Sequence, residues 1–506
     1  MNFTFSGFIA PKLPAGGKTA SASLGGRLFQ ATIGLMLKNV VILLLASALT
    51  ALLISRREHP QLPPIVAPQI LTPPVVTPPP PRFPTINTLL REAHASPALA
   101  GAAIGFCLID AKGEVVMEDN AQTAFIPASS LKTLTTATAL EVLGPDFHFT
   151  TALKSTAPIE VGVIRGDLVI VGGGDPMLAM ADLKAWAEEL KKRGLRTITG
   201  RLRGDARLFP GSLYGDFWNW GDIGNGYGSG VSGLNLNHNR YTLAFRAGET
   251  VGAPAVLLGI STEVPDAAWH NEVSTGPKDS GDGVVIHGGE MTSAIHLRGT
   301  VPLGAANFRV TGAVPDPVRF TIHHFSQMLA AQGIQISNTK TADAEPKHDL
   351  LKHESPPLLD IIKSIHASSD NHETECVFRM LGVKVGKAPD LVIREHWKPR
   401  GLDFIGLRME DGCGLARADF IRPLDLARLQ FLAVSGPQGA GYKDSLLSKD
   451  GLRWKGGAMS GVRTYTGFVK AKSGAEYCFA FMVNHYADGK VVSELSHKLM
   501  DAMRGL

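Results

Sequence analysis

Cysteine is scarce in this sequence, and its absence from most of the chain excludes several architectures. The 506 residues contain four cysteines, Cys107, Cys376, Cys413 and Cys478, and no C-x-x-C or Cys/His spacing typical of zinc. So few cysteines in so long a chain exclude a disulfide scaffold. Buried, unreactive thiols are the favoured interpretation, and a single disulfide is the alternative if the chain is exported. We expect no metal and no cofactor.

A strong excess of charge of one sign is also missing. Lys and Arg together number 50 against 46 Asp and Glu, a net charge of +4. Residues 1–58 hold six basic side chains against one acidic side chain, so the rest of the chain carries 4 − 5 = −1. This balance gives no electrostatic reason to expect a nucleic-acid partner. With 44% hydrophobic and 19% charged residues the chain is too apolar for disorder, and its length predicts at least two domains.

One uncharged apolar run stands near the N-terminus, NVVILLLASALTALLI at residues 39–54. Its length and composition predict a transmembrane signal-anchor. More basic residues precede it than follow it, which predicts that residues 1–38 are cytoplasmic and that the remainder is periplasmic, anchored in the inner membrane. Two alternatives stay open: a start at Met36 that makes the run an export signal, and cleavage near Ala46 to Ala48.

A proline-rich linker follows the apolar run over residues 55–84. Eleven prolines lie between residues 60 and 84, too many for a helix or a sheet. The segment is therefore expected to form extended polyproline II, which could hold the folded part up to about 75 Å from the membrane.

Beyond residue 84 the chain mixes helix and strand patterns, which predicts an α+β fold. Amphipathic stretches predict helices over residues 131–144, 180–194 and 317–333, and CLIDAKGEVV and TGFVKAKSGAEYCFAFMVN predict antiparallel hairpins. Between residues 146 and 309 the composition shifts to Gly-rich strands. We expect that region to be a β-rich insertion, of one or more domains, into a domain formed by residues 85–145 and 310–506.

A serine and a lysine at catalytic spacing begin the helix PASSLKTLTTATALEVLG. Ser129 and Lys132, three residues apart, lie on one helix face, so the amine can reach the hydroxyl. A lysine kept neutral by burial can take the proton of such a serine, and a backbone N–H at the helix start can stabilise an oxyanion. This S-x-x-K pattern is typical of penicillin-recognising enzymes, yet it also occurs by chance, as at Ser337 and Lys340. The alternative is a capping serine with a solvated lysine.

Two further elements follow in the order that such enzymes require. Ser369-Asp370-Asn371 precedes a helical stretch and offers a hydroxyl and an amide, although a plain helix cap would use the same residue types. For the third element, Lys-(Thr/Ser)-Gly on a strand, the literal match Lys472-Ser473-Gly474 falls where a hairpin turn belongs. Lys455-Gly456-Gly457 in WKGGAMSGVRTYTGFV is the better candidate because a strand continues after it.

With these residues in place, the chain resembles the class C low-molecular-weight penicillin-binding proteins, the D-alanyl-D-alanine carboxypeptidase/endopeptidase family. The resemblance covers about residues 85–506. Its motifs occur in family order: PASSLKTLTTATALEVLGPDFHFTT, GDLVIVGGGDPML, GDARLF, WNWGD, SSDNHETECVFRMLG, DGCGLAR and KGGAMSGVRTYTGFVKAKSG. The resemblance implies a penicillin-recognising, serine transpeptidase-like domain, an antiparallel sheet with flanking helices, that carries the large inserted region.

The resemblance also implies roles for individual residues. Ser129 resembles the acylated nucleophile, Lys132 its base, Ser369 the leaving-group relay, Asn371 the substrate holder and Lys455 the lysine of the strand motif. The oxyanion hole would be the backbone N–H groups of Ser129 and Ala458, with Gly456 and Gly457 beside the substrate. Asp222, Tyr227 and Arg417 match a subsite for the ammonium and carboxylate of a diaminopimelate side chain; the alternatives are a surface acid, a packed aromatic and a surface base.

The activity implied is a serine DD-peptidase of peptidoglycan stem peptides, cleaving D-Ala-D-Ala or D-Ala–diaminopimelate bonds and acylated by β-lactams. Two positions depart from the family pattern: Gly456 replaces a threonine whose hydroxyl would bind the substrate carboxylate, and Cys413 replaces a serine. The alternative is a catalytically impaired homologue that binds peptidoglycan peptides or a partner. A β-lactamase is disfavoured because the insertion is superfluous for it and no deacylating glutamate can be assigned.

Overall fold

A computed structural model describes residues 83–339 and 344–506. The chain divides into two compact units, Met1–Pro79 and Pro80–Leu506, and the description covers the second unit only. The expected signal-anchor at 39–54 and the linker up to residue 82 therefore lie outside the described residues. Within the described ranges, no helix combines the length and the apolar character that a membrane span needs.

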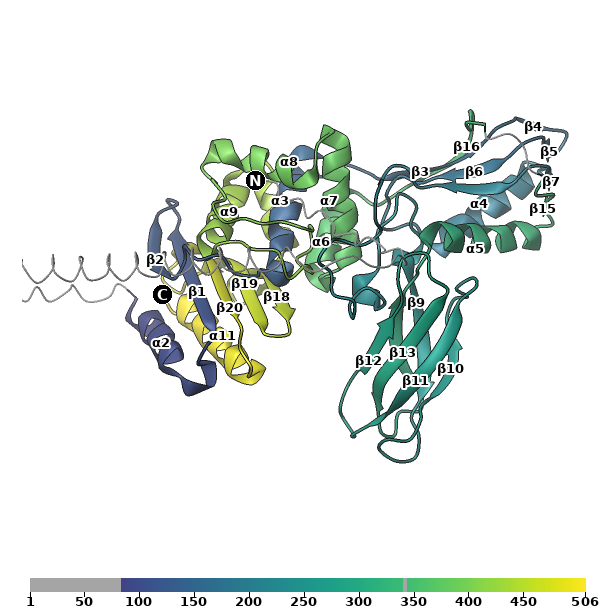
Figure 1. The fold of residues 1–506 in the computed structure, drawn as a ribbon. Helices are drawn as coiled ribbons and strands as arrows, with labels where there is room; N and C mark the ends of the chain where they lie inside the picture. Colours follow the sequence, from purple (N-terminus) through teal and green to yellow (C-terminus); the bar gives the residue numbers. More distant parts are fainter. Residues whose placement is uncertain (1–82, 340–343) are drawn as a thin grey trace, which may run out of the picture. The chain divides into compact units, whose positions relative to one another are not determined.

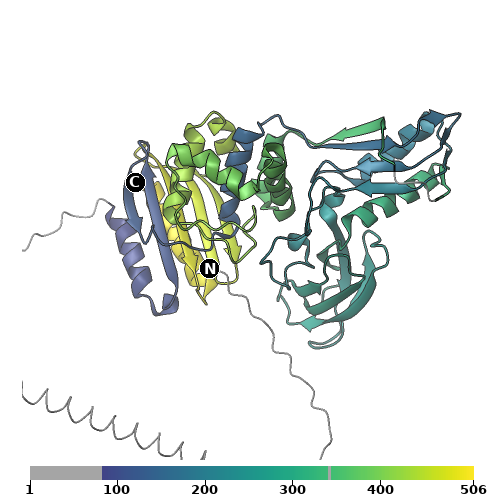
Figure 2. The ribbon, with the colours of Figure 1, turned by 45° about the horizontal axis from the view of Figure 1, so that its top comes forward.

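A six-stranded antiparallel sheet forms the centre of the first part of this unit, in the order β17-β18-β19-β20-β1-β2. Its strands are β1 (Ala103–Asp110), β2 (Val115–Asp119), β17 (Leu447–Lys449), β18 (Leu452–Met459), β19 (Val462–Lys470) and β20 (Glu476–Asn484). Strand β1 from near the start of the unit pairs with β20 from near its end, which Figure 2 shows as a dark blue strand beside yellow ones. Both predicted hairpins, β1–β2 and β19–β20, are confirmed.

Helices cover both faces of this sheet (Figure 1). The helices α2 (Pro84–Ala95) and α11 (Gly489–Arg504) pack on one face, where Phe106 and Phe481 are buried. The opposite face, with Cys107 and Ala480, packs on the larger core, which draws on α3 (Lys132–Val142), α6 (Leu358–Ser368), α7 (Asn371–Val385), α8 (Pro389–Trp397), α9 (Pro423–Ser435) and α10 (Gly439–Ser445). Successive residues of a strand point to opposite faces of the sheet. When both faces are covered, the sequence of each central strand is therefore a continuous apolar run.

The second part of the unit contains four smaller sheets around a core of its own. Two sheets, β16-β3-β6-β8 and β15-β7-β5-β4, use β3 (Thr150–Ser155), β4 (Ile159–Glu160), β5 (Val163–Ile164), β6 (Leu168–Val171), β7 (Thr197–Ile198), β8 (Leu202–Asp205), β15 (Gln335–Ile336) and β16 (His348–Glu354). The other two, β10-β9-β14 and β11-β13-β12, use β9 (Arg240–Arg246), β10 (Val256–Ile260), β11 (Ala268–Gly276), β12 (Gly283–His287), β13 (Ala294–Pro302) and β14 (Phe308–Ala313).

Two helices, α4 (Met180–Lys192) and α5 (Pro317–Ala331), pack on this second core. They and α3 confirm the three helices predicted from periodicity. The predicted end of the inserted region at residue 309 rests on composition and stays a prediction. In the structure α5, β15 and β16, which follow that residue, belong to the second core. The strand β16 pairs with β3, and β15 pairs with β7. Short 3-10 turns complete the unit: η1 (Pro97–Leu99), η2 (Ala128–Leu131), η3 (Gly226–Gly228), η4 (Asn237–Asn239) and η5 (Lys398–Arg400).

All four cysteines are buried with free thiols. Burial raises the pKa of the Cys376 and Cys413 thiols well above the ordinary value. The predicted burial of the cysteines is thereby confirmed, and the raised pKa values favour unreactive thiols.

Candidate active site

Ser129 lies in the turn η2 at the start of α3, where it contacts Lys132. The Lys132 Nζ donates a 3.0 Å hydrogen bond to Ser129 Oγ, as the spacing of three residues predicts. Lys132 is fully buried, whereas Ser129 is half-buried and accessible. Ala128, immediately before the serine, has a φ of 45° in the left-handed region, so backbone strain is concentrated beside this hydroxyl.

Lys132 Nζ has two more acceptors, both from other elements. It donates to Asn371 Oδ1 at 2.5 Å and to the backbone carbonyl of Cys413 at 2.7 Å. An ammonium carries three N–H bonds, and each has an acceptor here, which fixes the amine beside the serine. Because Cys413 contributes its carbonyl oxygen and not its side chain, the change from serine to cysteine at this position leaves the contact intact.

Ser369-Asp370-Asn371 forms the junction between α6 and α7. Ser369 ends α6 with a φ of 61°, and the Asp370 carboxylate caps α7 by accepting from the Glu373 N–H at 2.9 Å. The cap interpretation is confirmed for Asp370, while the two neighbouring side chains contact Lys132 and Lys455 and their catalytic roles stay predictions. The second Asp370 oxygen accepts from Arg240 Nη1 at 2.6 Å, and although burial raises the pKa of Asp370, this guanidinium outweighs it and holds the pKa below the usual range.

Lys455 extends from β18 to the hydroxyl of Ser369. Its Nζ donates to Ser369 Oγ and to the carbonyl of Gly456, each at 2.8 Å. Burial, reinforced by the nearby charge of Lys132, lowers the pKa of Lys455 to about 7. An amine with this pKa holds or releases a proton near neutrality, which suits proton transfer through Ser369.

The strand that carries Lys455 has an open edge. β17 pairs with β18 only as far as Trp454, so in the described sheet the residues from Lys455 to Met459 have a strand on the β19 side alone. An open edge of this kind can accept an extended peptide by strand addition. Gly457 lies close to the backbone of the nucleophile: a Cβ built there would lie 2.5 Å from Thr464 Oγ1 and 2.7 Å from the Ser129 nitrogen, so only glycine fits at this position. Ala458, the other expected oxyanion donor, is exposed on the same edge.

The three expected subsite residues lie on two different loops. Tyr227 in η3 accepts a 2.8 Å hydrogen bond at its carbonyl oxygen from Asn371 Nδ2, and its hydroxyl donates to Asp222 Oδ1 at 3.0 Å. This places Asp222 and Tyr227 next to the Asn371 amide. Arg417 instead donates to the carbonyl of Ser460, in the turn after β18, at 3.0 Å. Their roles toward a substrate stay predictions.

The two rejected matches lie away from this cluster. Ser337 follows β15, where its N–H donates to the Ile198 carbonyl at 2.9 Å, and Lys340 lies outside the described residues. Lys472-Ser473-Gly474 occupies the turn between β19 and β20, as predicted.

Several contacts of the site could not be read from the sequence. Lys132 and Asn371 donate to the backbone carbonyls of Cys413 and Tyr227. Every residue type has such a carbonyl, so the sequence gives no signal for these contacts. A buried carboxyl pair lies beneath the Cys413 loop: Asp411 accepts from the backbone N–H of Cys413 at 3.0 Å, and burial together with the Asp411 charge raises the pKa of Glu375 to about 7. The motif DGCG could have predicted the Asp411 contact, because an aspartate before a turn commonly accepts hydrogen bonds from the backbone N–H groups of that turn.

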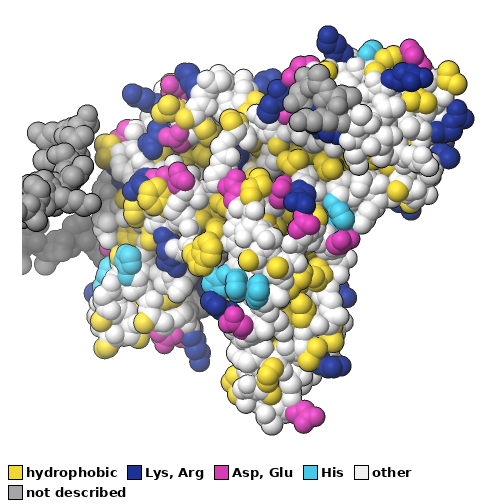
Figure 3. All heavy atoms as spheres, turned by 45° about the vertical axis from the view of Figure 1, so that its right-hand side comes forward, with side chains coloured by type: hydrophobic (Ala, Val, Ile, Leu, Met, Phe, Trp, Pro, Cys, Tyr) yellow, Lys and Arg dark blue, Asp and Glu magenta, His cyan; other side chains and the backbone are white. Residues whose placement is uncertain are grey.

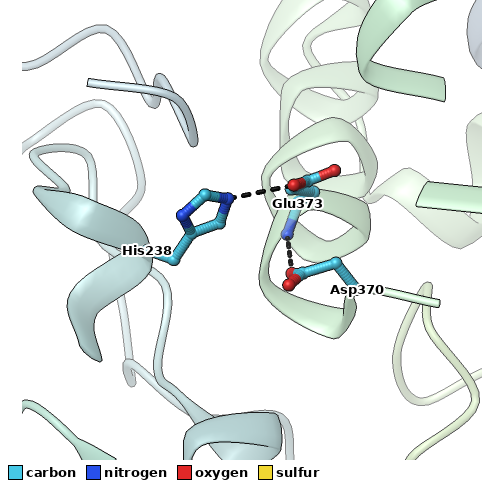
Figure 4. A group of neighbouring side chains, drawn as sticks. All are labelled: His238, Asp370 and Glu373. Atoms are coloured by element: carbon cyan, nitrogen blue, oxygen red, sulfur yellow. Dashed lines mark hydrogen bonds and ion pairs between the residues drawn. The ribbon is translucent and has the colours of Figure 1, made fainter. Parts of the chain in front are cut away.

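Within residues 83–339 and 344–506, two groups of His, Cys, Asp or Glu side chains bring possible metal-ligand atoms close together, and one of them is drawn in Figure 4. His238 approaches α7, and its Nε2 lies 2.9 Å from Glu373 Oε1, with Asp370 beside them. Both Asp370 oxygens are already engaged, one by the Arg240 guanidinium, which opposes a cation. We interpret this group as an ion-pair contact that joins the inserted region to the start of α7. The other group is Glu375, Asp411 and Cys413, all buried.

Comparisons with known proteins found similar sequences and structures. A family model described as the D-Ala-D-Ala carboxypeptidase 3 (S13) family matches residues 86–504. The D-alanyl-D-alanine carboxypeptidase of Actinomadura sp. (strain R39) is 29% identical over 433 residues, covering 77% of this chain and 79% of the relative. The D-alanyl-D-alanine carboxypeptidase DacB of Haemophilus influenzae is 24% identical over 425 residues, covering 78% of this chain and 88% of the relative.

Solved structures show the same fold. The crystal structure of penicillin binding protein 4 (dacB) from Haemophilus influenzae matches with a TM-score of 0.70 at 21% identity, covering 83% of this chain and 97% of that chain. A second structure of that protein, complexed with a novel β-lactam, matches with a TM-score of 0.67 at 20% identity. The expected penicillin-recognising α+β fold is thereby confirmed.

Proposed function

The chain belongs to the D-Ala-D-Ala carboxypeptidase 3 (S13) family, and from this premise we propose that it is a serine DD-peptidase that cleaves D-Ala-D-Ala bonds of peptidoglycan stem peptides through an acyl-enzyme. The observation that carries the proposal is the 3.0 Å contact between Lys132 Nζ and the accessible Ser129 hydroxyl. A serine is a weak nucleophile unless an adjacent base takes its proton.

In the acylation step, Ser129 Oγ attacks the carbonyl carbon of the penultimate D-Ala while its hydroxyl proton passes to Lys132 Nζ. The developing oxyanion accepts hydrogen bonds from the backbone N–H groups of Ser129 and Ala458. Gly457 supports this arrangement because the lack of a side chain there lets β18 approach the Ser129 backbone closely. The substrate backbone lies along the open edge of β18 and is held on its other side by the Asn371 amide.

Collapse of the tetrahedral intermediate breaks the peptide bond, and the departing amine needs a proton. Lys455 and Ser369 supply the route: the Lys455 ammonium donates to Ser369 Oγ at 2.8 Å, and that hydroxyl passes its own proton to the amine. Water then attacks the ester carbonyl and the ester bond to Ser129 breaks. Ser129 Oγ takes back its proton from Lys132, and the proton lost by water returns through Ser369 to Lys455. A β-lactam enters by the same attack on its amide carbonyl and stays attached because its leaving amine remains tethered.

The subsite contacts extend the proposal to diaminopimelate-containing peptides, including the D-Ala–diaminopimelate cross-link. Asp222 would take the side-chain ammonium and Arg417 the carboxylate, each matched in charge to its group. The hydrogen bond between Asp222 and the Tyr227 hydroxyl, beside Asn371, supports a place for this subsite next to the substrate backbone.

The alternative hypothesis, a catalytically impaired homologue, was based on Gly456. No other feature of the described site supports that hypothesis. The threonine hydroxyl would bind a carboxylate, whereas attack on the carbonyl depends on Ser129, Lys132 and the oxyanion donors. Losing one hydrogen bond to a charged group costs about 1.5–3 kcal/mol, which slows turnover without abolishing it.

We propose that the enzyme works in the periplasm, held to the inner membrane through residues 39–54. The basic excess before this segment and the proline-rich linker after it support the proposal. An alkaline phosphatase reporter fused after Pro84 should be active and should sediment with membranes. An inactive reporter would contradict export, and an active reporter in the soluble periplasmic fraction would indicate that the segment is cleaved.

Hydrolysis of a pentapeptide ending in D-Ala-D-Ala, followed by mass spectrometry, tests the activity. The purified enzyme should release one D-Ala, Ser129→Ala should release none, and Ser337→Ala, the matched change in the second S-x-x-K, should behave like the parent. Release by Ser129→Ala, or loss in Ser337→Ala with the fold retained, would overturn the assignment.

A further inference from the structure

The indole of Trp218, in the inserted region, contacts the buried carboxylate of Asp411. Its Nε1 donates a 2.8 Å hydrogen bond to Asp411 Oδ2, and the two residues are 193 positions apart in the chain. Asp411 is 1% exposed and Trp218 is half-buried. A Cβ built on Gly215 would lie 2.7 Å from the indole nitrogen, so a larger residue there would displace the N–H group. The fold therefore keeps space for an indole donor at this carboxylate.

Asp411 organises the loop that follows it, residues 412–416. Its oxygens accept hydrogen bonds from three backbone N–H groups of this loop: Cys413 at 3.0 Å, Gly414 at 2.5 Å and Ala416 at 2.7 Å. With the indole, four N–H donors surround one carboxylate. Hydrogen bonds to an ionised acceptor are stronger than neutral ones. Of these four donors, Trp218 alone lies outside the loop.

Other buried acids make Asp411 dependent on its donors. Burial and, second, the charge of Asp411 raise the pKa of Glu375 to about 7 and the pKa of Asp419 well above its usual range. A buried charge is costly unless hydrogen bonds compensate it. Removal of the Trp218 donor would therefore let the carboxylate turn toward its remaining donors.

The loop 412–416 contributes an acceptor to the Lys132 amine and packs against the turn η2. The Cys413 carbonyl accepts from Lys132 Nζ at 2.7 Å. A Cβ built on Gly414 would lie 2.0 Å from the Ala128 carbonyl oxygen, so the loop touches the backbone of η2 directly. Rotation of the Asp411 carboxylate would therefore move an acceptor of Lys132.

The inserted region also supports the other acceptor that holds Lys132 beside the serine. Asn371 Oδ1 accepts from Lys132 Nζ, and Asn371 Nδ2 donates to the Tyr227 carbonyl at 2.8 Å. Tyr227 and Trp218 belong to one short segment, residues 218–227. That segment therefore contacts the supports of both acceptors.

We propose that Trp218 is a positioning residue of the peptidase, which acts on Lys132 through Asp411 and the Cys413 carbonyl. The inference rests on the proposed function, in which the Ser129 proton passes to Lys132. A donor that fixes Asp411 also fixes the carbonyl that holds the amine 3.0 Å from the hydroxyl. Reaction rates depend strongly on such placement, since a misplacement of about 1 Å caused by a remote change can cost about a hundredfold.

The alternative is that Trp218 only anchors the inserted region. Stopped-flow acylation by a fluorescent penicillin separates the two roles, because it yields the affinity K of the first complex and the acylation rate constant k2. Trp218→Phe keeps an aromatic ring packed near Tyr214 and removes the N–H donor. In this variant k2 should fall about ten- to a hundredfold while K changes less than about twofold. A mere anchor would lower thermal stability and leave k2 of the folded enzyme unchanged.

Trp220→Phe is the matched control on the same segment. Trp220 is 64% exposed and stacks on His287, with ring centroids 6.3 Å apart. Figure 3 shows hydrophobic and histidine side chains next to one another on the molecular surface. Both k2 and K of this variant should match the parent.

A double-mutant cycle with Asp411→Asn tests the route. If Trp218 acts through Asp411, Trp218→Phe should slow acylation by less than about twofold further in the Asp411→Asn background. Trp218→Leu and Asp411→Glu replace any variant that thermal unfolding shows to be unfolded. An unchanged k2 in the Trp218 variant, an equal loss in Trp220→Phe, or additive losses in the cycle would overturn the inference and leave the proposed function standing. A parent that takes up no penicillin would overturn both.

Discussion

The Lys455 Nζ donates a 2.8 Å hydrogen bond to Ser369 Oγ from a buried position on β18. The two residues come from parts of the chain 86 positions apart and meet only because the end of α6 lies beside this strand. The buried Lys455 amine has a hydroxyl and a carbonyl as partners but no carboxylate, so burial destabilises its charged form. This effect should appear in the pH dependence of protein stability.

Lys455→Met should change the pH dependence of stability. Burial lowers the folded-state pKa of Lys455 to about 7, whereas the unfolded chain keeps the ordinary lysine value of about 10.4. Between these values the unfolded chain binds more protons, so the stability of the parent rises with pH from about 7 to about 10. Thermal unfolding should show that Lys455→Met is stabilised, relative to the parent, by several degrees more at pH 6 than at pH 10. A pH-independent difference would contradict the lowered pKa.

Arg240→Gln should destabilise the junction that carries Ser369 and Asn371. Arg240 is the partner of the buried Asp370 carboxylate, and removal of one member of a buried pair costs about 3 kcal/mol. Because the folded-state pKa of Asp370 is depressed, the pair stabilises the protein fully above the ordinary aspartate pKa of about 3.9 and loses this effect progressively as pH falls from there toward the depressed folded-state pKa.

Denaturant unfolding at pH 7 and pH 2.5 measures this prediction, with Arg309→Gln, an exposed arginine on β14, as the matched control. The loss in Arg240→Gln should be largest at pH 7 and clearly smaller at pH 2.5, and the control should stay within about 0.5 kcal/mol of the parent at pH 7. Equal losses in both variants would indicate that the pair contributes nothing specific.

Gly456→Thr should raise D-Ala-D-Ala carboxypeptidase activity. The added hydroxyl can bind the terminal carboxylate, which is worth up to about ten- to a hundredfold in rate. A Cβ at this position lies 3.3 Å from the Tyr465 ring, so the ring must shift slightly to admit it. Gly456→Ala adds the same Cβ without the hydroxyl and serves as the control in steady-state peptide hydrolysis. A similar gain in both variants, or a loss in Gly456→Thr alone, would argue against carboxylate binding here.

Arg417→Ala should remove selectivity for diaminopimelate over lysine. A lysine side chain offers the ammonium to Asp222 but no carboxylate to Arg417, so the parent should prefer diaminopimelate peptides by about 5- to 150-fold in kcat/KM. Penicillin acylation should be unchanged in the variant, because a β-lactam does not use this subsite. Equal rates of the parent on the two peptides would return Asp222, Tyr227 and Arg417 to ordinary surface roles.

Local patterns predicted the parts of this molecule that depend on neighbours in the chain. The contact of Ser129 with Lys132 follows from a spacing of three residues, and the hairpins and the helices α3, α4 and α5 follow from periodicity. Contacts that depend on tertiary packing had no such signal. The β16 strand returns to pair with β3 across almost 200 residues, and composition gives no trace of that pairing.

The backbone contacts of the site were equally hidden. The carbonyls of Cys413 and Tyr227, which bind Lys132 and Asn371, are present in every residue type, so only the fold selects them.

Acylation of Ser129 is the most direct test of the account. The full chain is incubated with benzylpenicillin, digested, and the penicilloyl peptide is sequenced by mass spectrometry. The account predicts one penicilloyl group per chain, on Ser129, and none in Ser129→Ala. A label on the peptide that contains Ser337, or a folded protein that takes up no label, would contradict it.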